Sequence, residues 1–226
     1  MSVTTMDIEQ ARFNMIQQQI RPWEVLDPVV LNLLSLVKRE MFVPLEYQDL
    51  AFADVEIPIG SLGHHDQTLL TPKMEARILQ ELNLKNTDTV LEIGTGSGYM
   101  AALIAARAEY VYSIEIDPSL ADTARNNLQQ AGVANVSVDI GDGAQGWPLQ
   151  APYDAIVLSG STPVLPQSIL HELKIGGRLV AIVGDAPAMH LQLFTRVGED
   201  AFSTITVLET VVAPLRNTMP RDKFVF

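Results

Sequence analysis

A glycine-rich turn between an apolar strand and a helix constrains this chain more than any other feature. The turn spans residues 93–99 and reads Ile-Gly-Thr-Gly-Ser-Gly-Tyr. It follows an apolar run and precedes an alanine-rich helical stretch. In open α/β sheets, ligands bind outside the carboxyl ends of the strands, where glycines permit tight turns and a close approach of the backbone. The pattern therefore predicts a ligand-binding turn in a doubly wound α/β domain.

The spacing of the glycines narrows the class of ligand. A dinucleotide site has the pattern G-x-G-x-x-G, whereas Gly94, Gly96 and Gly98 give G-x-G-x-G. Tyr99 then stands where the dinucleotide pattern has glycine or alanine. Glu92 would repel a pyrophosphate but suits a ligand with an ammonium group and a sulfonium, so we expect S-adenosylmethionine rather than NAD. The alternative is a glycine turn in a ligand-free α/β domain. The expected cofactor contacts in this stretch are Glu92, Gly94, Thr95, Gly96, Ser97, Gly98 and Tyr99, the last being equally compatible with the hydrophobic core.

Carboxylates also follow the next two predicted strands. Glu115, with Ile116 beside it, ends the second strand roughly 20 residues beyond the turn, where an acidic residue can accept both ribose hydroxyls. Asp142 follows the third strand, and we expect it to bind an adenine amino group. Gly141 and Gly143 would give the backbone room for that ligand. The alternatives are a solvated strand end at Glu115 and an ordinary turn around Asp142.

Strands and helices alternate after about residue 87. This rhythm predicts a mostly parallel sheet with right-handed crossovers. Two late strands have no convincing helix between them and predict an antiparallel hairpin at one edge. We expect strands at 90–93, 110–115, 136–138, 153–158, 178–183, 190–196 and 203–212, and helices at 99–107, 117–131 and 167–173. The fold class is therefore α/β, a doubly wound, mostly parallel seven-stranded sheet.

The chain before residue 87 has a different pattern, of helices and loops. We expect helices at 7–20, 29–37 and 71–82, with an ordered loop between the last two. Asp27-Pro28 and Thr71-Pro72 each read as a helix cap followed by proline at the first helical position. We therefore divide the chain into an N-terminal helical and substrate-loop segment packed on the core (1–86), a cofactor-binding α/β core (87–216) and a C-terminal tail (217–226).

Composition limits the partners and the location. The 226 residues carry a net charge of −12 with no run of lysine or arginine, so we expect no general nucleic-acid binding. The absence of cysteine excludes disulfides and thiolate metal sites and fits a reducing compartment; we expect no metal. No window approaches the roughly 18 apolar residues of a membrane helix, and residues 1–10 lack the apolar core of a secretory signal. We expect a cytoplasmic protein, monomer or homodimer, with no membrane partner.

Several motifs, taken in chain order, resemble those of the protein-L-isoaspartate O-methyltransferase family. Residues 91–99 are similar to that family's cofactor loop, which alone would indicate only the broad methyltransferase class. The resemblance covers about residues 10–216, and the ordered set is specific to the family. The other matching motifs are Arg39–Pro44, Ile57–Gly60, Gln67-Thr68 followed by Pro72 and Met74, Gly141–Gly143 with Gly146-Trp147, Ala151–Ile156, Leu173–Val180 and Val212–Arg216.

The resemblance implies a fold, a reaction and roles for residues. The fold is that of the Rossmann-like class I S-adenosylmethionine-dependent methyltransferases. The reaction moves a methyl group from S-adenosylmethionine to the α-carboxylate of isoaspartyl residues in damaged proteins, a protein-repair step that leaves S-adenosylhomocysteine. By position, the loop glycines, Glu115 and Asp142 contact the cofactor, and Thr68 lies near the donor methyl.

Two departures from the family pattern fall where the acceptor should bind. The family has Gln-Thr-Ile-Ser before the proline, and its serine is assigned to the active site, whereas Leu70 stands at that position here and cannot hydrogen-bond. The loop at 61–66 is longer than the family's glycine turn and contains His64 and His65. Two alternatives therefore stay open: a methyltransferase for another acceptor, either a small molecule or a specific protein, and a non-catalytic S-adenosylmethionine-binding module.

The chemistry demands little of the side chains near the acceptor. A carboxylate is already ionised at neutral pH, so methyl transfer to it requires alignment and no general base. The catalytic candidates are Thr68, Thr71 and His65. His65 could take a proton from a phenol or an amine acceptor, the alternative being a solvated loop. For Thr71 the alternative is a helix cap.

Overall fold

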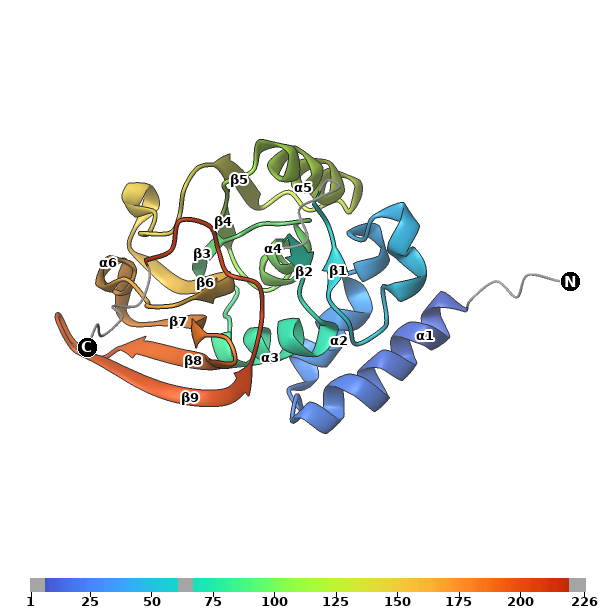
Figure 1. The fold of residues 1–226 in the computed structure, drawn as a ribbon, viewed down its shortest axis with the longest axis horizontal. Helices are drawn as coiled ribbons and strands as arrows, with labels where there is room; N and C mark the ends of the chain where they lie inside the picture. The colour runs from blue at the N-terminus through green and yellow to red at the C-terminus, as the bar shows by residue number, and fades with distance from the viewer. Residues whose placement is uncertain (1–6, 61–66, 220–226) are drawn as a thin grey trace, which may run out of the picture.

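A seven-stranded sheet forms the centre of the structure, a computed structural model that describes residues 7–60 and 67–219 (Figure 1). The strands lie in the order β5-β4-β3-β6-β7-β8-β9. Those from β5 to β7 run parallel, and β8 and β9 are antiparallel to their neighbours. In chain order they are β3 (Thr89–Ile93), β4 (Tyr110–Glu115), β5 (Val136–Ile140), β6 (Tyr153–Thr162), β7 (Leu173–Asp185), β8 (Ala188–Arg196) and β9 (Phe202–Thr210). The predicted mostly parallel sheet with an antiparallel edge hairpin is confirmed.

Helices cover both faces of this sheet, and the strands alternate to match. In β6, Ala155 and Val157 belong to one hydrophobic cluster, whereas Ile156 and Leu158 belong to the other. Successive side chains of a strand point to opposite faces, so a strand buried on both sides is a continuous apolar run. The first cluster includes buried residues of α3 (Pro72–Leu82), α4 (Tyr99–Ala105) and α5 (Pro118–Gln130), and the second those of α6 (Gln167–His171).

The N-terminal segment packs on the first of these faces. Met15 and Leu34, from its first two α-helices, belong to the same hydrophobic cluster as β3 and α4. In Figure 1 this segment (blue to cyan) lies beside α3 and α4. Its elements are α1 (Ile8–Met15), a π-helical turn (Ile16–Ile20), 3-10 turns (Arg21–Trp23, Arg39–Met41 and Leu45–Leu50), α2 (Pro28–Leu36), and the paired strands β1 (Ile57–Pro58) and β2 (Thr68–Leu69). The divisions at 86/87 and 216/217 stay predictions.

The local signals in the sequence are largely confirmed. Asp7, Asp27 and Asp117 cap α1, α2 and α5 with their side chains. Thr71 occupies the N-cap position of α3, but its side chain makes no capping hydrogen bond. The strand predicted at 153–158 continues to Thr162, because polar residues there still pair with β7.

A buried ion pair joins the N-terminal segment to α3. Arg39 and Glu75 are each 1% exposed and form a direct ion pair. The same guanidinium donates to the Leu70 carbonyl at 2.7 Å and lies 5.1 Å from the ring centre of Tyr99, at the start of α4. Arg39 thereby connects the 3-10 turn that carries it to α3, α4 and the backbone at Leu70.

We expect Arg39→Met to destabilise the protein by about 3–5 kcal/mol, because it leaves the Glu75 carboxylate buried without its cation. Urea unfolding measures the change. The double variant Arg39→Met/Glu75→Leu should recover most of the loss, since it removes both charges. Arg125→Met, at an exposed position of α5, is the matched control. A loss below about 1 kcal/mol for Arg39→Met would contradict the assignment of a buried pair.

Candidate active site

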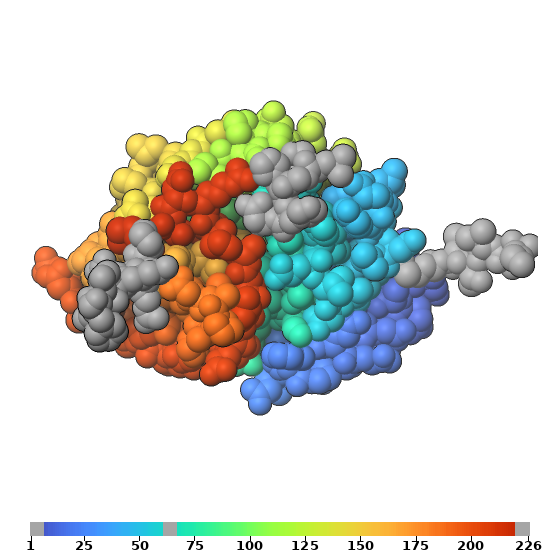
Figure 2. Space-filling view, viewed as in Figure 1, coloured from blue at the N-terminus to red at the C-terminus, as the bar shows by residue number. Residues whose placement is uncertain are grey.

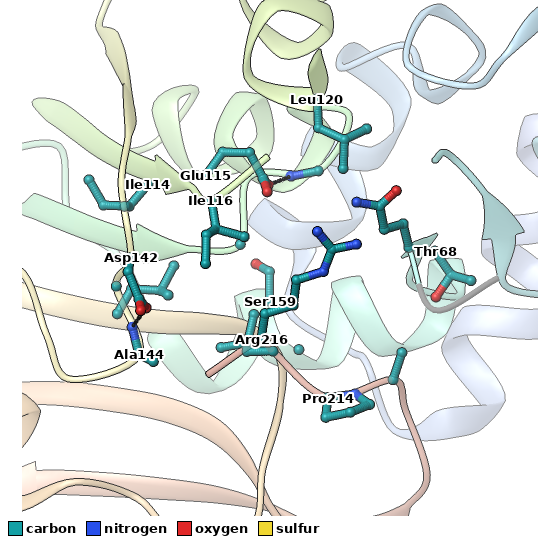
Figure 3. Close-up of a pocket in the computed structure, with 18 of the residues that line it drawn as sticks. Thr68, Ile114, Glu115, Ile116, Leu120, Asp142, Ala144, Ser159, Pro214 and Arg216 are labelled. Carbon is teal, nitrogen blue, oxygen red and sulfur yellow. Dashed lines mark hydrogen bonds between the residues drawn. The ribbon is translucent and has the colours of Figure 1, made fainter. Parts of the chain in front are cut away.

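A cavity opens at the carboxyl ends of β3, β4, β5 and β6, where the strand order reverses between β3 and β6 (Figure 3). Its empty space is about 760 Å³, counting the part that is open to solvent. Ligands of open α/β sheets bind at such a reversal point. Eight predicted contacts line this cavity: Thr68, Gly94, Gly96, Glu115, Ile116, Gly141, Asp142 and Gly143.

Hydrogen bonds to the neighbouring strand fold the glycine turn. The backbone nitrogens of Gly94 and Thr95 both donate to the Ile114 carbonyl, at 2.9 and 3.3 Å. Gly96 has a φ of +55°, and a Cβ there would lie 2.9 Å from Cδ1 of Ile59. A side chain at this position would meet both backbone strain and a clash, so glycine is required.

Glu115 ties the turn to the next strand end. It is 5% exposed, and its two carboxylate oxygens accept hydrogen bonds from the backbone nitrogens of Gly96, at 2.8 Å, and Asp117, at 3.0 Å. Each carboxylate oxygen has two lone pairs, so both retain capacity for a further donor. The geometry is suited to a pair of neighbouring hydroxyls in the cavity.

Asp142 lies on the opposite side of the cavity from Thr68 (Figure 3). Its carboxylate accepts hydrogen bonds from the backbone of Ala144, at 3.0 Å, and from Asn217 Nδ2, at 2.9 Å. The glycines on either side serve packing: an added Cβ at Gly141 would lie 2.7 Å from the Trp147 ring, and one at Gly143 would lie 2.8 Å from Ile93. Glycine at these positions therefore leaves room for Trp147 and Ile93, and both glycines also line the cavity, so their contact with a cofactor stays a prediction.

Glu92 lies beneath the turn and is 0% exposed. Its carboxylate accepts hydrogen bonds from Ser113, at 2.5 Å, and from Ser159, at 2.9 Å, and Ser159 lines the cavity. Burial raises the pKa of Glu92 to about 8 in spite of these hydrogen bonds. Glu92 therefore reaches the cavity through Ser159, and its direct contact with a cofactor stays a prediction.

The remaining loop residues of the prediction also lie outside the cavity lining. The Thr95 hydroxyl is 2.6 Å from that of Ser113, and the Ser97 carbonyl accepts a hydrogen bond from Asn127. Gly98 caps α4 in the left-handed conformation. Tyr99 is 1% exposed and packs on Phe42, so it lies in the hydrophobic core, the second of the two expectations for it.

Of the residues predicted to lie near the methyl acceptor, some line the cavity and others do not. Thr68 lines the cavity and donates its hydroxyl to Glu56 at 2.8 Å. Leu70 also lines the cavity and is 5% exposed. Thr71 begins α3 and lies outside the lining. His65, like His64, lies outside the described residues.

One wall of the cavity is formed by a segment after β9, and this segment was not predicted from the sequence. Residues 213–216 line the cavity, because Ser161 donates to the Ala213 carbonyl at 3.0 Å and Leu215 donates to the Ser161 carbonyl at 2.8 Å. No local pattern reveals this long-range pairing. Ser159 was also missed, although its place at the carboxyl end of a predicted strand could have identified it.

The fold and the cavity define a class of protein. A glycine turn after β3, an acidic end to β4 and a ligand cavity at the reversal of strand order belong to the S-adenosylmethionine-dependent methyltransferases of the Rossmann-like class. Residues 10–219 match the model of the family "Protein-L-isoaspartate(D-aspartate) O-methyltransferase (PCMT)". The chain belongs to this family.

Relatives and solved structures agree with this assignment. The chain is 42% identical to a protein-L-isoaspartate O-methyltransferase of Syntrophus aciditrophicus, over 85% of this chain and 86% of the relative. It is 46% identical to protein-L-isoaspartate O-methyltransferase 1 of Rhodopseudomonas palustris, over 84% and 76%. A solved protein-L-isoaspartate O-methyltransferase superposes with a TM-score of 0.78 at 24% identity, over 94% of this chain and 67% of that one. A Plasmodium falciparum structure assigned to the same family, in complex with S-adenosyl-L-homocysteine, gives 0.74 at 18% identity, over 93% and 98%.

Within residues 7–60 and 67–219, no helix has the length and apolar character to cross a membrane. The same residues contain no group of three or more histidine, aspartate or glutamate side chains placed to hold a metal ion.

The buried carboxyl of Glu92 should make stability depend on pH. Its pKa is about 8 in the folded state and 4.5 ordinarily, so between these values the folded state holds a proton that the unfolded state has lost. Its contribution to stability therefore falls as pH rises from about 4.5 to about 8. We expect the free energy of unfolding of Glu92→Gln, relative to the unsubstituted protein, to rise by a few kcal/mol between pH 5.5 and 8.5 in urea titrations. Exposed Glu46→Gln is the control, and a pH-independent difference for Glu92→Gln would refute the buried, raised carboxyl.

Proposed function

We propose that this protein transfers the methyl group of S-adenosylmethionine to the α-carboxylate of isoaspartyl residues in proteins. The observation that carries the proposal is the cavity beside Glu115, found in a chain that belongs to the protein-L-isoaspartate O-methyltransferase family. The product is a methyl ester on a damaged protein, so the reaction is one of protein repair.

The cavity residues suggest how the cofactor is held. Glu115 would accept hydrogen bonds from the ribose hydroxyls. Its carboxylate oxygens have lone pairs that the hydrogen bonds from the backbone nitrogens of Gly96 and Asp117 do not occupy. Asp142, on the far side of the cavity, would accept the adenine amino group. The sulfonium end would then point toward Thr68 and Leu70, where the acceptor enters.

The reaction requires alignment of the acceptor more than acid–base chemistry. Bound S-adenosylmethionine supplies an activated methyl group. An isoaspartyl α-carboxylate is ionised at neutral pH, so the chain needs only to hold one carboxylate oxygen in line and exclude water. The apolar wall formed by Leu70, Pro214 and Leu215 is suited to excluding water. No general base is required of the residues that line the cavity.

Methylation of an isoaspartyl peptide tests the proposal directly. With labelled S-adenosylmethionine, the protein should form base-labile methyl esters on an isoaspartyl peptide and none on the matched aspartyl peptide. Gly96→Val should abolish the labelling and the binding of S-adenosylhomocysteine, because the added side chain strains the turn and meets Ile59. Binding of S-adenosylhomocysteine without methylation of the isoaspartyl peptide would reject the acceptor and keep the cofactor. Unchanged binding by Gly96→Val would show that the turn is misassigned.

We also propose a location and a form. The absence of cysteine fits a reducing compartment, and we place the protein in the cytoplasm, as a monomer or a homodimer.

A second candidate function is methylation of another acceptor, either a small molecule or one specific protein. Leu70 favours it, because this buried side chain lines the cavity at the position where the family resemblance expects a serine hydroxyl. A leucine there offers the acceptor an apolar contact and no hydrogen bond.

Leu70→Ser separates the two candidates. If Leu70 alone limits the isoaspartyl reaction, the variant should methylate the isoaspartyl peptide faster, by about tenfold for one regained hydrogen bond to a charged group. Because removal of a buried leucine costs about 2–5 kcal/mol, unfolding in urea must first establish that the variant is folded. A folded variant with unchanged activity would show that the acceptor wall as a whole serves another substrate. Leu70→Ala controls for the lost volume.

A further inference from the structure

The cavity is poor in positive charge for an enzyme with an anionic acceptor. Glu115 and Asp142 line it, and Asp117 lies at its edge, in a chain with a net charge of −12. Among the described residues that line the cavity, Arg216 alone carries a basic side chain. A carboxylate that enters beside two others is stabilised by a nearby cation of the protein, in addition to the sulfonium of the cofactor.

The backbone fixes Arg216 over the cavity. The residue before it, Leu215, donates to the Ser161 carbonyl at 2.8 Å, and its side chain fills the space beside Gly94 and Gly160. The residue after it, Asn217, donates to Asp142 at 2.9 Å. Arg216 is therefore held between two anchored residues at the carboxyl end of β6.

The side chain of Arg216 extends into the middle of the cavity. Figure 3 shows its guanidinium between Glu115 and Thr68. It is 37% exposed and lies 3.8 Å from Asp117, an ion pair too long for a hydrogen bond. Hydrogen bonds from Ser119 and Gln67 lower the pKa of Asp117 to about 2, so this partner stays charged beside the guanidinium.

We propose that Arg216 binds the carboxylate of the methyl acceptor and sets the enzyme's preference for an anionic substrate. The inference rests on the proposed function, since it names the residue that would bind the charged carboxylate of the acceptor. The planar guanidinium suits a carboxylate, and one oxygen of that carboxylate stays available to the methyl group. Arg216 thereby supplies the polar contact that Leu70 cannot make.

The charge balance of the reaction predicts which kinetic constant changes. A carboxylate oxygen forms the new bond to the methyl carbon, the carbon–sulfur bond breaks with its electron pair on sulfur, and no proton moves. The carboxylate loses its charge as the ester forms, so Arg216 binds the substrate more strongly than the transition state. Substitution should raise KM for the acceptor without lowering kcat, which should stay the same or rise slightly.

Binding of two peptides tests the proposal without depending on turnover. One peptide carries an isoaspartyl residue with a free α-carboxylate, and the other carries the α-carboxamide in its place. The protein saturated with S-adenosylhomocysteine should bind the carboxylate peptide about tenfold more tightly than the carboxamide peptide, the size expected for a partly exposed, charge-assisted hydrogen bond. Arg216→Gln should lose this preference, and Arg216→Lys should keep part of it. Arg107→Gln, which removes the same charge outside the cavity, should behave as the unsubstituted protein.

Each other outcome overturns the proposal. Equal affinity of the unsubstituted protein for the two peptides means that no cation of the protein binds the carboxylate. If Arg216→Gln still prefers the carboxylate peptide, another group of the protein binds the carboxylate. Weaker binding of S-adenosylhomocysteine by Arg216→Gln, with the peptide preference intact, assigns Arg216 to the cofactor's own carboxylate. The proposed function fails separately, when a protein that prefers the carboxylate peptide does not methylate it.

Discussion

The two hydrogen bonds that Glu115 accepts from backbone nitrogens hold the site together. One comes from Gly96 in the turn after β3, and the other from Asp117 at the start of α5. A single carboxylate therefore fixes the turn relative to the adjacent strand end and points its remaining lone pairs into the cavity. Because Glu115 ends a buried parallel strand, its position is set by the register of β3 and β4 and requires no loop to order.

The turn, in contrast, depends on segments far away in the sequence. Ile59 lies against Gly96, and Leu215 lies against Gly94 and Gly160, so a segment before α3 and a segment after β9 pack on the same strand ends. Figure 2 shows the red end of the chain and the cyan residues that precede α3 meeting on one face of the molecule. The sheet positions the residues proposed to bind the cofactor, and these two segments cover them from outside.

The sequence could predict what depends on periodicity and local chemistry. The strand and helix rhythm, the aspartate caps and the acidic end of β4 all follow from such signals, and the structure has them at the expected places. The structural reason for a glycine is harder to predict, because an added side chain at Gly141 or Gly143 would meet Trp147 or Ile93, and these contacts depend on the tertiary fold. The place of Tyr99 in the core depends on Phe42 and Arg39, more than fifty residues earlier, which no local pattern encodes.

The same distinction explains why the acceptor is harder to infer than the cofactor. Residues proposed to bind the cofactor, such as Glu115 and Asp142, stand at strand ends, where a change of side chain also disturbs the hydrogen bonds that shape the turns. Leu70 and Arg216 stand on the covering segments, where hydrogen bonds that do not involve these side chains fix the backbone: Leu70 through its carbonyl to Arg39, and Arg216 through its neighbours. Their side chains can change while the backbone bonds persist. A methyltransferase built in this way can exchange a hydroxyl for an apolar contact, and place a cation across the cavity, without altering the surface that binds the cofactor.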